Sequence, residues 1–153
     1  MNLEQVKLVV YVGRSKRGKW PLSAFVTAAR QVAMREPVTG ALLDDGLGIF
    51  HVVEGTEAAV DRFMAFVLLS KRLKDTRVIY ETRRAAPMFD GQPLAYCFDA
   101  SWRERIATLI AAQPVDRRDL WHFCTGLAER IQRQGGPAAP PPLREAPAWW
   151  KGG

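Results

Sequence analysis

The chain has 153 residues, of which 48% are hydrophobic and 25% charged, as expected for a globular domain with some additional segments. Cys97 and Cys124 lie far apart and form no CxxC pair. This argues against a zinc knuckle or a disulfide framework and suits a reducing cytoplasm, where we expect the protein to act. The sequence contains no run of about 18 apolar residues, so we expect no membrane span.

The net charge is +6 and the pI is about 9.7, so nucleic acid has to be considered as a partner. The basic residues form small, separate groups at 14–19, 83–84 and 117–118. The first group has only Trp20 nearby to stack on a base. We therefore expect a solvated basic surface and keep a nucleic-acid-binding module as a weaker alternative.

The first half of the chain predicts three strands, with a helix between the first two. The first strand is apolar and rich in valine, which is typical of a buried strand. The helix is amphipathic and is stopped by Pro37. Asp45-Gly46 between the second and third strands is a strong hairpin signal. The predicted ranges are strands at 6–12, 38–44 and 48–53 and a helix at 21–34.

The next part of the chain predicts a second helix and two more strands. Gly55 and Thr56 break the strand pattern, and Thr56 is suited to cap a helix. Apolar residues then recur three and four positions apart, which predicts an amphipathic helix. The predicted ranges are a helix at 57–69 and strands at 76–83 and 94–98.

These elements follow the order β-α-β-β-α-β-β, which predicts an α+β fold of the ferredoxin-like type. In that arrangement two helices cover one face of an antiparallel sheet. Two C-terminal helices are expected to cover the other face, one over 101–112 and one beginning at Asp116, a good N-cap residue. Residues 137–153 are rich in proline and alanine and predict a flexible tail that contains Trp149-Trp150.

Four short motifs stand in a distinctive order: Val10-Tyr11, Val38-Thr39-Gly40-Ala41-Leu42-Leu43, Gly48-Ile49-Phe50 and Glu54-Gly55. Their order and spacing over about residues 6–98 resemble the BLUF domains, which are flavin-based blue-light sensors. The two helices that follow are similar to the C-terminal pair of short, stand-alone BLUF proteins. The resemblance divides the chain into a BLUF-like domain over 1–100, a helical pair over 101–134 and a Pro-rich flexible tail over 135–153.

The resemblance implies FAD as the cofactor, lying between the first two helices over the sheet. In the family, a Tyr on the first strand and a Gln on the third hydrogen-bond near the flavin. Light drives electron and proton transfer from the Tyr, and the Gln rearranges. Tyr11 matches that Tyr, whereas His51 occupies the position of the Gln.

Side chains alternate along a strand, so Tyr11 and His51 should both point toward the helix-covered face, where a hydrogen bond between them is expected. A neutral imidazole carries one donor and one acceptor on separate nitrogens and cannot copy a carboxamide. His51 therefore puts the photoswitch in doubt, and it would make the site sensitive to pH. The alternative interpretations are a core Tyr with a satisfied hydroxyl for Tyr11 and a half-buried structural His for His51.

At the other positions that correspond to the family's flavin pocket, some residues of this chain match the family and others do not. Arg30 fits the family's pattern in the first helix, but Val32 and Ala33 stand where the family has the two Asn that hold the flavin edge. Losing such a buried hydrogen bond costs about 1–3 kcal/mol. Arg72 matches the basic residue after the second helix, with an exposed helix-end cation as the alternative. Gln92, near the last strand, offers a carboxamide from another direction.

Three hypotheses follow. The first is a BLUF-family regulator with altered or lost photochemistry, which acts through an unidentified protein partner. The second is a working FAD photoreceptor with a divergent pocket, and the third is the basic nucleic-acid-binding module. The helices at 101–134 predict self-association or partner docking. We expect no enzymatic activity, because the chain has no P-loop or GxGxxG and His122 does not face Cys124 at helical spacing.

Overall fold

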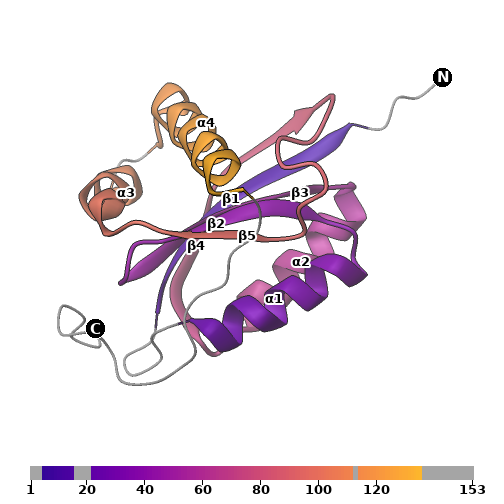
Figure 1. Ribbon diagram of the computed structural model, residues 1–153. Helices are drawn as coiled ribbons and strands as arrows, with labels where there is room; N and C mark the ends of the chain where they lie inside the picture. The colour runs from indigo at the N-terminus through magenta and orange to yellow at the C-terminus, as the bar shows by residue number, and fades with distance from the viewer. Residues whose placement is uncertain (1–4, 16–21, 112–113, 136–153) are drawn as a thin grey trace.

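Five strands form one sheet with helices on both of its faces, as Figure 1 shows. The computed structural model describes residues 5–15, 22–111 and 114–135. The elements are β1 (Val6–Ser15), α1 (Ser23–Arg35), β2 (Thr39–Asp44), β3 (Gly48–Gly55), α2 (Glu57–Leu69), β4 (Leu73–Arg84), β5 (Ala95–Phe98), a 3-10 turn (Ala100–Trp102), α3 (Arg103–Ala111) and α4 (Arg117–Gln134). The predicted α+β class and element order are confirmed. The basic group at 14–19 lies mostly outside the described residues, and so does the predicted tail from residue 136 onward.

The sheet has the strand order β4-β1-β3-β2-β5, with β1 and β3 in its centre. The pairs β4–β1, β1–β3 and β3–β2 are antiparallel, as expected for the ferredoxin-like core. The fifth strand differs from this expectation, because β5 pairs with β2 in parallel. A parallel neighbour requires a crossover, and the chain crosses from β2 through β3, α2 and β4 before it returns.

Two separate hydrophobic cores lie on the two faces of the sheet. The helices α1 and α2 cover one face, and α3 and α4 cover the other (Figure 1). Along β1, Val9 and Tyr11 belong to the first core, and Leu8, Val10 and Val12 belong to the second. A strand buried on both faces needs apolar residues at nearly every position, which explains the continuous valine-rich run.

Polar residues set the ends of the helices and the hairpin. Thr56 caps α2 by accepting a hydrogen bond from the Ala59 N–H, as predicted. Asp116 caps α4 in the same way through the N–H groups of the next turn. The predicted hairpin is present between Asp44 and Gly48: Asp45 N–H donates to Gly48 O, and Gly46, with φ of 95°, is the first central residue.

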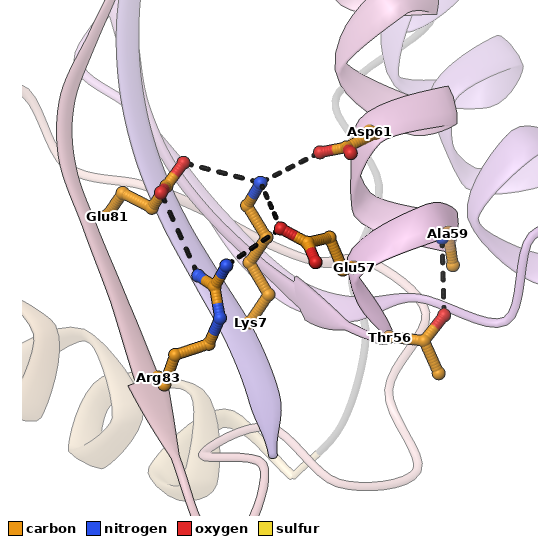
Figure 2. Close-up of polar contacts among 7 residues, drawn as sticks. All are labelled: Lys7, Thr56, Glu57, Ala59, Asp61, Glu81 and Arg83. Atoms are coloured by element: carbon orange, nitrogen blue, oxygen red, sulfur yellow. Dashed lines mark hydrogen bonds and ion pairs between the residues drawn. The ribbon is translucent and has the colours of Figure 1, made fainter. Parts of the chain in front are cut away.

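A cluster of ion pairs links β1, β4 and α2 (Figure 2). Lys7 is only 8% exposed, and its Nζ lies 2.8 Å from Asp61 and 3.3 Å from Glu81. Arg83 adds a second link, with its guanidinium 2.8 Å from Glu57 and 3.7 Å from Glu81. Each acidic partner is more than half exposed, so the cluster aligns three elements rather than adding much stability.

Candidate functional site

Tyr11 and His51 form a hydrogen-bonded pair in the centre of the sheet. They are directly opposite each other on β1 and β3, and both side chains point toward α1 and α2. The Tyr11 hydroxyl oxygen lies 2.7 Å from His51 Nδ1, and the rings meet edge to face at 5.1 Å. The hydrogen bond predicted from strand alternation is therefore present. In the Nε2–H tautomer the hydroxyl donates to Nδ1, and in the Nδ1–H tautomer the ring donates to the hydroxyl oxygen.

Burial keeps both members of this pair uncharged. Tyr11 is 0% and His51 1% exposed. Desolvation lowers the pKa of His51 to about 3 and raises the pKa of Tyr11 well above its ordinary value. His51 therefore stays neutral throughout the physiological range. The expectation that it makes the site sensitive to pH is wrong near neutral pH, because burial outweighs the ordinary basicity of imidazole.

Aromatic side chains from α1 and α2 continue from this pair toward the surface. Phe63 meets His51 edge to face at 5.6 Å, and Phe66 lies 6.0 Å from Phe63. Phe25 of α1 stacks on Phe66, also at 6.0 Å. These four rings and Tyr11 thus link the middle of the sheet to the outer side of the two helices.

The space between the sheet and the two helices is filled by these side chains. Phe63, Ala33 and Tyr11 are each 0% exposed, and Phe25 is 1% exposed. Val32, at 8%, also belongs to this core. Apolar side chains of α1, α2 and the sheet thus occupy the space beside Tyr11 and His51 in this structure. Val32 and Ala33 also offer no polar side-chain atom to the edge of a flavin ring.

A groove lies at the outer end of this aromatic path, between α1 and the C-terminal end of α2. Its volume is about 380 Å³. It is lined by Phe25, Ala28, Phe66, Leu69, Ser70, Lys71 and Arg72. The structure thus places Arg72 at the rim of a groove, separated from Tyr11 and His51 by the phenylalanines. A helix-end cation above aromatic side chains can attract an anionic or planar group.

Arg30 and Gln92 lie at the β5 side of the sheet. The Arg30 guanidinium donates two hydrogen bonds to the Leu94 carbonyl oxygen, at 2.8 and 3.0 Å, and burial lowers its pKa. Arg30 thereby fixes the start of β5 from α1. The Gln92 Oε1 atom is buried and has no hydrogen-bond partner among the described residues. Of the five predicted site residues, the structure joins only Tyr11 and His51 directly.

Glu54 is a buried polar residue for which the sequence suggested no role beyond its place in a motif. Its carboxylate accepts hydrogen bonds from the backbone N–H groups of Met88 and Phe89 and from the Thr39 hydroxyl. The side chain is 0% exposed, and desolvation raises its pKa. Glu54 therefore ties the strand that carries His51 to the β4–β5 loop. The sequence signal for this role was a single acidic residue at the end of an otherwise apolar strand.

Asp44 is a second buried carboxyl group, at the other end of the hairpin. It accepts hydrogen bonds from the Tyr96 hydroxyl at 2.9 Å and from the Gly46 N–H at 2.8 Å. Burial raises the pKa of Asp44 to about 6. Through its hydrogen bond with Gly46, Asp44 also stabilises the hairpin turn.

The described residues contain no group of three or more His, Cys, Asp or Glu side chains that could hold a metal ion. Within the same ranges, the helices are too short or too polar to cross a membrane. The pair Tyr11–His51 lacks a substrate-accessible face, so its chemistry is that of a shielded hydrogen bond between two neutral groups.

Comparisons with known proteins give a consistent result. The family described as "BLUF: Sensors of blue-light using FAD" matches residues 7–94, more than half of the chain. The fold is similar to BlrB, a BLUF protein in its dark state, with a TM-score of 0.67 and 17% identity over 84% of this chain and 99% of that chain. The photo-activated state of BlsA matches with a TM-score of 0.68 and 14% identity, over 80% of this chain and 94% of that chain. The BLUF domain of BlrP1 matches with a TM-score of 0.59 and 24% identity, over 91% of this chain and 98% of that chain. Among curated proteins there is no match.

Proposed function

The chain belongs to the BLUF family of blue-light sensors that use FAD, and within this family we propose that it is a regulator acting through a protein partner, with its flavin photochemistry altered or lost. The observation that carries the proposal is the buried Tyr11–His51 pair. The two side chains that would face the flavin satisfy each other's polar groups instead. Both side chains are almost completely buried in the core on this face of the sheet.

Three features of the same core support this proposal. His51 has no carboxamide, so it cannot take part in the rearrangement that the family resemblance assigns to Gln. Val32 and Ala33 replace polar groups by apolar ones, which favours packing of α1 on the sheet over binding of a polar ring edge. Phe63 occupies the space beside the His51 ring. The Tyr11 hydroxyl then has a structural role, which is to hold β1 and β3 in register.

The test is the visible absorption spectrum of the purified protein, with and without added FAD, in the dark and under blue light. We expect a colourless protein that takes up little FAD and shows no light-induced shift. The variant V32N/A33N/H51Q restores the polar groups and should bind FAD more tightly than wild type. The exposed His122→Gln substitution is the control for a change of one His and should have no effect. A wild-type protein whose flavin band shifts reversibly in blue light would overturn the proposal.

A second candidate function is a photoreceptor with a divergent pocket, favoured by the buried, unpartnered Gln92 Oε1 atom and by Arg72 at the groove. In that case α1 and α2 must separate to admit the ring. FAD would then remain bound through purification, and Gln92→Leu would change the position of the flavin band. A flavin band that is identical in Gln92→Leu would count against this candidate.

A further inference from the structure

The strand β4 forms one edge of the sheet and is its longest strand, with 12 residues from Leu73 to Arg84. No other strand within the described ranges pairs with its outer side. Every second residue of an edge strand directs its N–H and C=O away from the sheet, where they can pair with another chain. Proteins usually protect such an edge with bulges and charges, and both devices are present on part of β4.

The protection is uneven along the strand. The register between β4 and β1 is irregular opposite Val10/Tyr11 and opposite Val12/Arg14, and Asp75 has a positive φ of 54°. In contrast, residues 80–84 pair with 6–10 without interruption. This regular stretch leaves a straight edge of five residues, close to the usual length of a strand.

The same stretch lies beside a surface of arginine and aromatic side chains. Arg84 lies over the Trp121 ring of α4 at 4.8 Å, and Arg117 lies over the Tyr80 ring at 5.8 Å. Trp121 is 36% exposed although it is a large apolar side chain. Two basic groups that are far apart in sequence, 83–84 and 117–118, therefore meet at one edge of the sheet.

The charges on the two sides of this edge are different. On the α2 side, Glu81 and Arg83 are neutralised by each other and by the Lys7 cluster (Figure 2). The α4 side of this edge carries Arg84, Arg117 and Arg118 against Asp116 and Asp119. Arg84 also acts electrostatically on the buried Glu54 carboxyl group, and its Nε donates to the Ala86 carbonyl oxygen at 3.3 Å. Asp116 accepts hydrogen bonds from N–H groups of its own helix, so the surface charges on this side sum to a small positive excess.

We propose that the stretch 80–84 of β4 binds an acidic, extended segment of a partner protein, which adds as a strand to the sheet. The partner's backbone pairs with the open edge, and its carboxylates meet Arg84 and Arg117. The proposal rests on the proposed function in that it identifies the contact through which the chain signals. It does not depend on the state of the flavin site.

A peptide strand fits this surface better than a nucleic acid does. Arg84 covers a face of Trp121, and Arg117 covers a face of Tyr80, whereas stacking of bases requires open ring faces. The unpaired backbone of β4 matches another extended peptide backbone and has no counterpart in a phosphate chain. Guanidinium groups held in place by a ring are well arranged to pair with carboxylates.

The experiment uses the full chain as the target for a display library of random peptides of about ten residues, roughly the span of a long strand. The expected selection is for peptides in which Asp or Glu alternates with β-branched or aromatic residues. The best peptide is then labelled, and its Kd is measured by fluorescence anisotropy with wild type, Arg84→Glu and Arg117→Glu. Arg35→Glu is the matched control, because Arg35 is exposed on α1 beyond the other face of the sheet.

We expect Arg84→Glu and Arg117→Glu each to weaken the affinity for the peptide by about tenfold or more, and Arg35→Glu to weaken it by less than about twofold. A peptide N-methylated at alternate positions on one edge should also bind at least about tenfold more weakly, because it cannot donate its main-chain hydrogen bonds. Circular dichroism establishes that each variant is folded. If Arg84→Glu does not fold, Arg117→Glu, on the exposed first turn of α4, decides the question.

Several outcomes would overturn this proposal. The first is that the selected peptides contain no acidic residues. The second is that Arg84→Glu and Arg117→Glu both bind the peptide as tightly as wild type does. The third is that the N-methylated peptide binds as well as its parent. A single-stranded oligo-dT of about ten nucleotides that binds more tightly than any peptide, and is lost in Arg84→Glu, would assign the surface to nucleic acid instead. A flavin photocycle would overturn the proposed function and leave the peptide result unchanged, so the two failures are distinguishable.

Discussion

The stability of this protein should depend on pH through two buried groups that act in opposite directions. Burial lowers the pKa of His51 from its ordinary 6.5 to about 3 and raises the pKa of Asp44 from 3.8 to about 6. We expect the free energy of unfolding of wild type to change little between pH 7 and pH 5. Asp44→Asn should lose stability over this range, and His51→Leu should gain it.

The signs follow from which state binds the proton. Below pH 6.5 the unfolded chain protonates His51 and the folded chain does not, so stability falls by about 2 kcal/mol between pH 6.5 and pH 5. Below pH 6 the folded chain protonates Asp44 and the unfolded chain does not, so stability rises by about 1.4 kcal/mol between pH 6 and pH 5. In wild type the two effects offset each other to within about 1 kcal/mol. Glu54, whose pKa is also raised, acts in the same direction as Asp44 and is present in all variants.

The assay is urea unfolding at pH 7, 6 and 5, followed by circular dichroism, with the exposed His122→Leu as the control for loss of a His. Asp44→Asn should become less stable by about 2 kcal/mol from pH 7 to pH 5, and His51→Leu more stable by about 1.4 kcal/mol. His122→Leu should follow wild type. Equal pH slopes in Asp44→Asn and His51→Leu would refute the assignment of opposed pKa shifts, and with it the dry environment of the Tyr11–His51 pair.

Two further predictions concern other parts of the same sheet. Glu54→Ala leaves the N–H groups of Met88 and Phe89 without their buried acceptor and should cost about 1–3 kcal/mol for each in urea unfolding, whereas stability equal to wild type would contradict the role of Glu54. Gly40→Ala places a Cβ only 2.0 Å from the Val52 carbonyl oxygen, so the strands must separate. It should destabilise the protein by about 3 kcal/mol or prevent folding, and a normal melting temperature would show that β2 shifts easily.

The Tyr11–His51 contact could be predicted because the family resemblance brings together these positions of the first and third strands. Strand alternation then places both side chains on the helix-covered face. The aromatic path through Phe63 and Phe66 could not be predicted, because helical spacing shows that these residues face inward but does not fix their rotamers. The two hydrogen bonds from Arg30 to Leu94 were also missed, since they depend on where the parallel fifth strand begins.

The length of β4 illustrates a different limit. The strand was predicted at 76–83, after a basic turn that follows the second helix. It begins earlier, at Leu73, and includes the charged Lys74 and Asp75, since an edge strand exposes much of its surface and tolerates charge. That the basic groups at 83–84 and 117–118 meet could not be predicted either, because the contact of Arg84 with the Trp121 ring joins residues that are far apart in sequence.

The persistence of a tyrosine at the centre of this sheet does not require photochemistry. Tyr11 is completely buried, so its hydroxyl must find a partner or cost about 1–3 kcal/mol, and His51 supplies that partner directly across the strand pair. Replacing both residues by apolar ones of similar shape would be nearly neutral, but replacing either one alone would leave a buried polar atom unpaired. Each residue of the pair therefore needs the other to satisfy its buried polar group. On the proposed function, the core of a light sensor can become a purely structural core while the exposed edge of β4 remains available to a partner.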